Sequence, residues 1–291
     1  MPIDLQKFAQ TVRVLDGAWG TELQKRGLPA GACPELWNDQ NPAAVEAVAR
    51  SYVEAGSEII LTNTFGGNRF VLAQHGAGER AAELCEKGAA ISRKAAGGAA
   101  KVFASLGPTG KIVMMEDVPA EELAEAFAAS SVALERSGAD AIVLESFSEL
   151  AEVEIALRAV RGAVAIPVVV SMTFSSGPDK TASMMGDAPA DLARAAETGG
   201  AHAVGANCGV GPDNYVAVAK LFRAATALPV WIKANAGLPQ VRADGATVFP
   251  MGPAEFAAFA PKLVAAGANF LGGCCGTTPD HIRALRKALG K

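Results

Sequence analysis

Short apolar runs alternate with longer amphipathic segments along the whole chain. The apolar runs are rich in valine, isoleucine and alanine and are bounded by turn residues, which is typical of buried parallel strands. Eight of them predict strands at residues 12–16, 58–63, 102–106, 141–145, 168–173, 203–208, 230–235 and 270–274. The segments between them have apolar residues at helical spacing and predict helices at 42–55, 78–96, 120–137, 151–161, 188–198, 213–226, 253–266 and 279–289.

Eight strand and helix pairs are the number that closes a barrel. We therefore predict an α/β fold, a single (β/α)8 TIM barrel domain covering residues 1–291, because such barrels typically take roughly 250 residues. The active site of a barrel lies at the carboxyl ends of its strands. Polar and reactive residues should gather there, and in this chain they follow most of the predicted strands.

Composition limits the classes of partner. Lys and Arg total 26 against 30 Asp and Glu, for a net charge of -4 without a basic block, so neither nucleic acid nor a membrane surface is expected as a partner. No stretch reads as a signal peptide or a membrane span, and we expect a cytoplasmic protein. The five cysteines, an odd number, favour reduced thiols over a disulfide framework.

Three cysteines stand at the ends of predicted strands amid glycine. Cys208 closes the sixth strand, and Cys274 and Cys275 follow the eighth in the run GGCCGTTP at 272–279. We expect the three sulfurs to face one point on the rim, with the glycines letting the backbone turn both adjacent thiols toward it. Buried thiols that pack as small hydrophobes, or a vicinal disulfide, are the alternatives.

Zinc suits three thiolates, and three protein ligands leave a fourth position open for substrate. The histidines are poor candidates, because His75 lies in a helical connection, His202 begins a strand and His281 follows the last strand. Cys33 and Cys85 are expected to be buried packing residues. An electron-rich site of this kind activates water poorly but holds a substrate thiol as a nucleophilic thiolate. The pattern therefore favours alkyl transfer to sulfur.

Two carboxylates are predicted on the same rim. Asp16 ends the first strand, within DGAWGT at 16–21, and Glu145 ends the fourth. They could pair with a substrate ammonium or act as an acid and base. Beside a thiolate zinc site we favour ammonium binding, which implies an amino acid that carries a thiol. A helix N-cap is the alternative for Asp16.

Together these residues resemble the homocysteine S-methyltransferase family, which includes betaine-dependent and S-methylmethionine-dependent enzymes and the homocysteine-binding module of cobalamin-dependent methionine synthase. The form NAGLP at 235–239 looks most like that module. The resemblance covers nearly the whole chain, through DGAWGT at 16–21, TNTFG at 62–66, Gly107-Pro108, ANC at 206–208 and GCCG at 273–276.

This resemblance implies a zinc-dependent enzyme that methylates homocysteine to methionine. The zinc ligands, which are also the catalytic residues, would be Cys208, Cys274 and Cys275. Backbone amides near Gly17 and Ala18 would take the amino acid carboxylate, and Asn235 would cap the metal or orient the thiol. The full set of substrate-binding residues would be Asp16, Gly17, Ala18, Asn63, Phe65, Glu145 and Asn235.

The expected partners are homocysteine and a methyl donor, either S-methylmethionine or a methylcorrinoid. The chain has no D-x-H-x-x-G cobalamin motif, so a separate protein is expected to present a corrinoid. Three other functions stay open. The chain could be another zinc-dependent thiol or corrinoid methyltransferase, a Schiff-base aldolase that uses Lys233, or a homocysteine-binding subunit without turnover.

Overall fold

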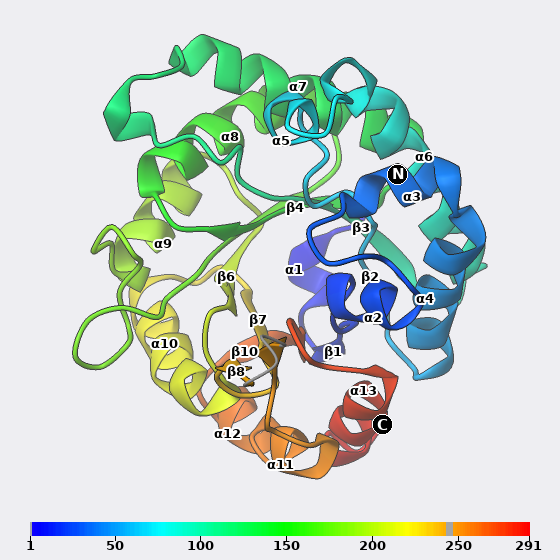
Figure 1. The fold of residues 1–291 in the computed structure, drawn as a ribbon. Coiled ribbons are helices and arrows are strands. Elements are labelled where there is room, and N and C mark those ends of the chain that lie inside the picture. The colour runs from blue at the N-terminus through cyan, green and yellow to red at the C-terminus, as the bar shows by residue number, and fades with distance from the viewer. Residues whose placement is uncertain (1, 243–246) are drawn as a thin grey trace.

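The computed structural model describes residues 2–242 and 247–291. Within them, eight parallel strands form a nearly closed barrel that helices surround (Figure 1), in the order β1-β10-β7-β6-β5-β4-β3-β2. This confirms the predicted (β/α)8 TIM barrel. The barrel strands are β1 (Arg13–Val14), β2 (Ile59–Ile60), β3 (Lys101–Leu106), β4 (Ala141–Phe147), β5 (Val168–Met172), β6 (Ala203–Cys208), β7 (Val230–Ala234) and β10 (Ala268–Gly273).

The first two strands meet through a side chain as well as through the backbone. The Glu58 N–H donates to the Val14 carbonyl at 2.8 Å, and the Glu58 carboxylate accepts from the Val14 N–H at 3.0 Å. Arg13 donates to the same carboxylate at 2.8 Å. These bonds join the two ends of the sheet beside the short strands β1 and β2.

The longer helices cover the outside of the barrel and bury one apolar face against it. In α4, Asn41 caps the first turn by accepting from the Ala44 N–H, and Val45, Val48 and Tyr52 lie buried along one face. No helix in the described part of the chain combines the length and the apolar character that crossing a bilayer demands. The helices are α1 (Leu5–Phe8), α2 (Gly20–Lys25), η1 (Pro34–Leu36), α3 (Trp37–Gln40), α4 (Pro42–Glu54), α5 (Arg69–Ala73), η2 (Gly78–Arg80), α6 (Ala81–Ala96), η3 (Val113–Met115), α7 (Ala120–Arg136), α8 (Leu150–Ala163), α9 (Pro189–Thr198), α10 (Pro212–Ala225), α11 (Pro253–Ala257), α12 (Ala260–Ala265) and α13 (Pro279–Ala288).

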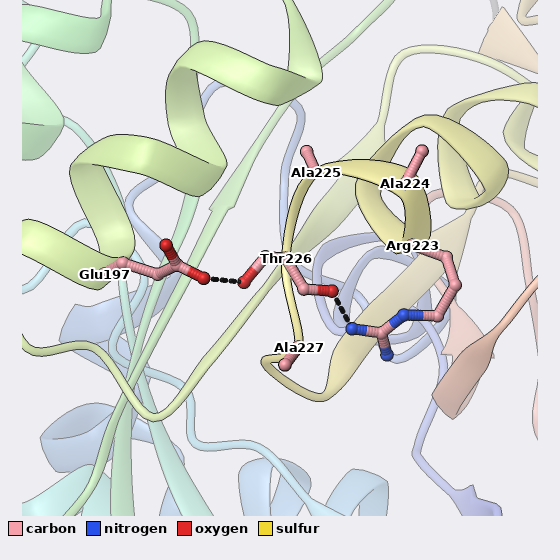
Figure 2. A pocket seen from close by; sticks show the side chains of 6 residues that line it. All are labelled: Glu197, Arg223, Ala224, Ala225, Thr226 and Ala227. Carbon is pink, nitrogen blue, oxygen red and sulfur yellow. Dashed lines mark hydrogen bonds between the residues drawn. The ribbon is translucent and has the colours of Figure 1, made fainter.

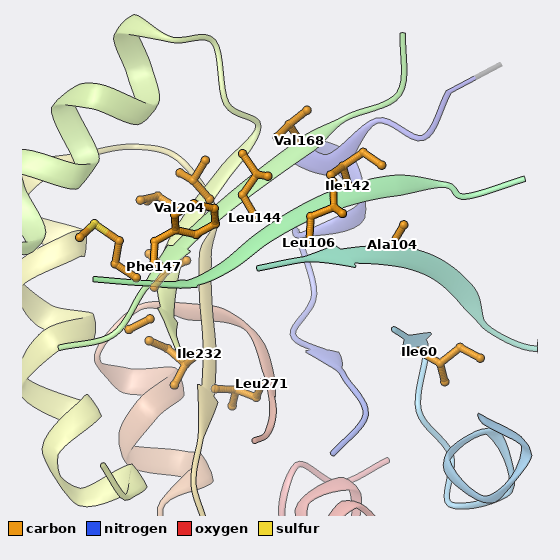
Figure 3. Close-up of a cluster of buried hydrophobic side chains, with 14 of the residues drawn as sticks. Ile60, Ala104, Leu106, Ile142, Leu144, Phe147, Val168, Val204, Ile232 and Leu271 are labelled. Carbon is orange, nitrogen blue, oxygen red and sulfur yellow. The ribbon is translucent and has the colours of Figure 1, made fainter. Parts of the chain in front are cut away.

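The strands bury both of their faces, and the two faces form separate cores. Outward side chains such as Ile142 and Ile232, labelled in Figure 3, belong to the larger core cluster, which also contains buried side chains of the helices. Inward side chains fill the barrel, where the Trp231 ring lies 6.0 Å from that of Phe103 and 5.5 Å from that of Phe270. The alternation between core and barrel interior continues toward the carboxyl ends of the strands, where the site lies.

One helix closes the amino-terminal end of the barrel and was not among the predicted elements. Leu5 of α1 belongs to the barrel-interior core, and the Phe8 ring lies 6.4 Å from that of Phe270. Arg13, at the start of β1, donates to the Phe8 carbonyl at 2.7 Å. This end of the barrel is therefore filled by apolar packing.

Two further departures from the predicted pattern lie after β7. The segments β8 (Gln240–Val241) and β9 (Thr247–Val248) pair antiparallel as a separate two-stranded sheet. The helix expected at 253–266 is divided into α11 and α12, because Pro261 has no N–H with which to continue α11.

Candidate metal centre and active site

The three predicted cysteines come together at the carboxyl-terminal rim. The sulfurs of Cys208, Cys274 and Cys275 all lie within 4.8 Å of one another, and the Cys208 and Cys275 sulfurs are 4.0 Å apart. Zinc bonds sulfur at about 2.3 Å, so a tetrahedral zinc site places its sulfurs about 3.8 Å from each other. The spacing thus fits a single metal ion with three sulfur ligands.

The cysteines are free thiols, so the vicinal disulfide is not present. Burial and the hydrogen bonds among the thiols act on their ionisation. The bond with Cys274 lowers the pKa of Cys208, but the bond with Cys275 and burial outweigh it and raise that pKa to about 12. A bound divalent cation would supply the positive charge that holds such thiols as thiolates.

An unusual backbone conformation presents the Cys208 sulfur. Cys208 has φ +65°, in the left-handed region that residues other than glycine rarely adopt. The Tyr215 hydroxyl of α10 bonds the carbonyls of both Asn207 and Cys208, at 2.9 and 2.8 Å. The Asn207 side chain accepts from Ser171 at 2.6 Å and donates to Ser146 at 2.6 Å. These contacts hold the strained turn at Cys208 in place. The sequence alone does not predict Tyr215 as part of the site.

The Cys274-Cys275 pair continues the sheet and then turns. The Cys274 N–H donates to the Ala234 carbonyl at 2.7 Å, and the Cys275 carbonyl accepts from Ala236 at 2.9 Å. Gly276 follows with φ +79°, as the prediction of a flexible turn requires. Gly273 acts differently, since a Cβ there would lie 2.2 Å from the Thr277 Oγ1. It is needed for close approach rather than for conformational freedom.

The remaining cysteines and histidines lie outside the cluster. Cys33 and Cys85 are buried, and their sulfurs donate to the Glu35 carboxylate and the Gly67 carbonyl, at 3.2 and 3.1 Å. This confirms the packing interpretation. Burial lowers the pKa of His202, whose Nδ1 accepts from the Val168 N–H. His281 caps α13, where its Nδ1 accepts from the Thr278 N–H.

Asn235 follows β7, the strand between the two cysteine-bearing strands β6 and β10. It is 3% exposed, and its side-chain oxygen is buried without a hydrogen-bond partner in the described residues. A buried orphan acceptor costs about 1–3 kcal/mol, so it calls for a ligand. This oxygen suits the predicted role of capping the metal or contacting the substrate.

Asp16 is fully buried and is not a helix N-cap, because Trp19 occupies that position of α2. Its Oδ2 accepts from the Leu61 N–H at 2.7 Å and from the Trp19 indole at 2.8 Å. Its Oδ1 lies 2.5 Å from the Lys233 ammonium, which is itself 2% exposed. The predicted ammonium-binding carboxylate thus already has a cation as its partner.

Glu145 lies buried near this pair and accepts from the Ser105 hydroxyl at 2.5 Å. Burial raises the pKa of Glu145, against the opposing effects of the Lys233 charge and the Ser105 hydrogen bond. Burial alone would lower the pKa of Lys233, but the charges of Asp16 and Glu145 raise it above its ordinary value. Lys233 is therefore held as an ammonium, which is a poor nucleophile.

The loop after β1 is fixed by hydrogen bonds. The Ala18 N–H, one of the amides expected to take a carboxylate, donates to the Thr277 Oγ1 at 3.1 Å. The Ala18 carbonyl accepts from Tyr52 at 2.7 Å, and a Cβ on Gly17 would lie 2.7 Å from the Thr277 Oγ1. Carboxylate binding by the Ala18 amide would therefore replace an existing bond, and that role stays a prediction.

The two residues expected from the motif after β2 differ in accessibility. Asn63 is 4% exposed, and its side-chain amide donates to the Pro34 carbonyl and to Asn38. Phe65 is 44% exposed, and its ring packs so close to Gly107 that a Cβ there would lie 2.5 Å away. The Asn63 side chain therefore stabilises the loop through buried hydrogen bonds, while the Phe65 ring is exposed at the surface and accessible to a ligand or partner.

Two surface hollows lie away from the cysteines. The first is lined by Glu197 and by residues 223–227, which precede β6 and β7, so it lies at the opposite end of the barrel. Figure 2 shows Thr226 donating to Glu197 and accepting from Arg223, so its polar groups are paired. The second lies between α8 and α9, where its walls include Arg158 and Arg194. Neither hollow is lined by Cys208, Cys274 or Cys275.

Comparison with known proteins gives matches along almost the entire chain. Residues 13–289 match the family model described as homocysteine S-methyltransferase. The chain is 33% identical to methionine synthase of Mycobacterium leprae over 99% of its own length, and 32% identical to that of Mycobacterium tuberculosis over 98%. It spans 25% of the length of each of these relatives.

Solved structures support the fold alone, because their sequence identities are low. The metallated form of the Escherichia coli homocysteine methyltransferase MmuM superposes with a TM-score of 0.81 at 24% identity, covering 99% of both chains. A dihydrodipicolinate synthase from Agrobacterium tumefaciens gives a TM-score of 0.57 at 15% identity, covering 97% of this chain and 77% of that one. Both comparisons agree with the barrel architecture.

Proposed function

Because the chain belongs to the homocysteine S-methyltransferase family, we propose that it methylates homocysteine on sulfur to give methionine, at a zinc ion held by Cys208, Cys274 and Cys275. The observation that carries the proposal is the convergence of three sulfurs from β6 and β10 within 4.8 Å. Zinc is the metal best matched to three thiolates with one position left open.

When bound, zinc would hold the acceptor sulfur in its deprotonated, nucleophilic form. The protein residues supply position and charge around it. The side-chain oxygen of Asn235 would face the metal until the acceptor sulfur takes its place, which accounts for its lack of a partner. Tyr215 and Asn207 would fix the Cys208 ligand, in the way that outer hydrogen bonds orient metal ligands.

The amino acid part of the acceptor would bind beside the buried acids. Glu145 would accept a hydrogen bond from the substrate ammonium, because only one of its oxygens is bonded, to Ser105, in the described residues. The backbone near Gly17 and Ala18 would take the carboxylate, with Thr277 released from the Ala18 amide. No protein nucleophile is required, since the substrate thiolate itself would attack the methyl group while the bond between methyl and donor breaks and its electron pair leaves with the donor.

A corrinoid-bearing protein is the donor that the surface of the rim favours. Of the ten large apolar side chains that are exposed in the described part of the chain, eight lie on loops that follow barrel strands. Such a concentration on one face is typical of a contact surface. They are Phe65 after β2, Ile112, Met114 and Met115 after β3, Met184 and Met185 after β5, and Leu238 and Val241 after β7.

The length comparison is consistent with such a donor. The relatives named methionine synthase extend over about four times the length matched here, since the match spans 25% of each, which leaves them room for a donor-presenting module. We call the eight side chains the apolar rim, and we propose that the donor protein docks on it. Free S-methylmethionine would need no such surface.

The aldolase alternative is disfavoured by the contact of its own candidate residue. Schiff-base formation needs a neutral lysine, whereas Lys233 pairs with Asp16 at 2.5 Å inside the barrel. A homocysteine-binding subunit without turnover would share the same sulfur cluster and acids. It differs from the proposed enzyme only in the absence of product.

One assay tests the proposal and separates the donors. Zinc-loaded protein is incubated with homocysteine and, in turn, methylcobalamin, S-methylmethionine, betaine and methyltetrahydrofolate, and methionine is measured by mass spectrometry. We expect methionine with methylcobalamin, with no product from a Cys274→Ala variant. Homocysteine binding without methionine from any donor would support the subunit alternative, and absence of both would contradict the proposal.

A further inference from the structure

Lys233 is a buried cation that the proposed reaction does not use. The side chains of Trp231 and Lys233 on β7 have the same orientation because residues alternate along a strand, and Asn235 follows directly after its last residue. Trp231 lies in the barrel-interior core, so Lys233 stands one level above it, below the rim. A lysine with 2% exposure requires a partner of opposite charge, and Asp16 supplies it at 2.5 Å.

The hydrogen bonds of Asp16 are almost complete without any substrate. An ionised carboxylate accepts about four hydrogen bonds. Asp16 already accepts three, from Lys233, the Leu61 N–H and the Trp19 indole. It is also fully buried. Asp16 therefore works as an anchor for three parts of the site rather than as an open contact for a ligand.

Glu145 is the acid that can still accept hydrogen bonds from a substrate. Within the described residues one of its oxygens accepts from Ser105 and the other accepts no hydrogen bond. Lys233 acts on Glu145 through its charge and bonds Asp16 directly. With both carboxylates ionised, the two acids and the lysine together carry a charge of -1, so at most one further positive charge is needed to neutralise the site.

We propose that Lys233 is the resident cation of the Asp16–Glu145 pair and sets the selectivity for the acceptor, so that Glu145 alone contacts the ammonium of the substrate. This inference rests on the proposed function. A site with two open carboxylates would depend strongly on that ammonium. With Lys233 in place, thiols that lack the ammonium are accepted at a modest disadvantage.

The test compares homocysteine with 4-sulfanylbutanoate, which has the same thiol and carboxylate but no ammonium. Isothermal titration calorimetry of the zinc-loaded full chain gives the ratio of the two Kd values. For the wild type we expect a preference for homocysteine of about tenfold, the contribution of one charge-assisted hydrogen bond. Lys233→Met should raise the preference to about a hundredfold, because both acids then require a cation.

Lys233→Met leaves the buried Asp16 carboxylate without its cation, and this variant could fail to fold. A double variant then tests the inference in its place. Asp16→Asn combined with Lys233→Met removes both charges and restores a net charge of -1 through Glu145 alone. Its preference for homocysteine should stay within about threefold of the wild type, since Glu145 still provides its single charge-assisted bond. Lys220→Met, at an exposed position on α10, is the matched control and should change nothing.

The outcomes separate this inference from the proposed function. A ratio unchanged in Lys233→Met would show that Lys233 does not set the selectivity, and a preference lost in the double variant would show that Asp16 is the ammonium contact. Either result would overturn the inference. If neither thiol binds the wild type, the proposed function fails. The inference is then tested with the ratio of the Kd values for methionine and for 4-(methylsulfanyl)butanoate, which lacks the ammonium. A larger preference for methionine in Lys233→Met than in the wild type supports the inference, and an unchanged preference overturns it.

Discussion

The two ends of the barrel interior are built on the same strands and yet differ in every physical respect. Toward the amino-terminal end, Trp231, Phe103 and Phe270 pack as aromatic rings that α1 covers. Two residues further along β7, the interior holds Lys233 paired with Asp16, and the sulfur cluster lies at the rim above. A step of two residues along β7 therefore changes the barrel interior from an aromatic core to a layer of buried charged groups.

This difference teaches how the fold separates stability from reactivity. Within the described residues, the aromatic end is built from apolar and aromatic side chains that pack closely, although the Trp231 indole N–H is buried there without a hydrogen-bond partner. The polar end contains buried charges, an orphaned asparagine oxygen and a cysteine in the left-handed region, each of which costs free energy. The barrel tolerates the second end because the first end and the packing between strands and helices supply the hydrophobic cores.

The largest expected effect comes from removing a sulfur at the polar end. Cys274→Ala should abolish stoichiometric zinc binding and reduce turnover by a factor of about a thousand or more, since the open-site chemistry needs the metal. Atomic emission spectroscopy of the purified protein measures the zinc. Cys85→Ala is the matched control, because Cys85 is buried outside the cluster. Full zinc content in Cys274→Ala would contradict the assignment of zinc binding to the sulfur cluster.

A change at the aromatic end should act on stability instead. Trp231→Ala removes a large buried ring and should lower the free energy of unfolding by about 3–5 kcal/mol. The folded fraction should still bind one zinc per chain. Urea denaturation followed by circular dichroism gives the first quantity. A variant that keeps its stability but loses zinc would contradict the division between the two ends.

Replacing one acid at the polar end should affect binding of the acceptor more than the chemical step. Glu145→Gln should raise the KM for homocysteine by about 10-fold to 100-fold, because it removes a charge-assisted hydrogen bond to the ammonium. The kcat should change by less than about threefold. Steady-state kinetics with methylcobalamin as donor separate the two constants, and an unaltered KM would remove Glu145 from the acceptor site.

A smaller effect is expected from a residue that touches no substrate. Tyr215→Phe deletes the hydroxyl that bonds the Asn207 and Cys208 carbonyls, and it should weaken zinc binding by about tenfold. The loss of stability should be only about 1 kcal/mol. Competition with a chromophoric chelator measures the zinc affinity. Unchanged zinc affinity would mean that the turn at Cys208 keeps its conformation without the hydrogen bonds from Tyr215.

The sequence was sufficient to predict the barrel and the clustering of the three sulfurs, because both depend on local patterns. Apolar runs fix the strands, and glycine beside cysteine at the end of a run indicates which residues reach the rim. The eight barrel strands lie at their predicted positions within a few residues. Cys208 and the pair after β10 are brought together although they lie far apart in the chain.

The charge arrangement could not be predicted in the same way. Asp16 and Lys233 are 217 residues apart, and their contact depends on which side chains point inward at one level of the closed barrel. The sequence predicts Asp16 at the substrate and Lys233 in a rival reaction, and it does not predict that the two pair. The hydroxyl of Tyr215 was missed for a similar reason, because a helical tyrosine is most often a packing residue.

The central claim is that three sulfurs from β6 and β10 hold one zinc ion whose remaining position receives the acceptor sulfur. X-ray absorption spectroscopy at the zinc edge of the loaded protein tests it directly. We predict three sulfur neighbours at about 2.3 Å and one lighter atom, which homocysteine replaces with a fourth sulfur. Fewer than three sulfurs, or a set of neighbours that homocysteine leaves unchanged, would contradict the account.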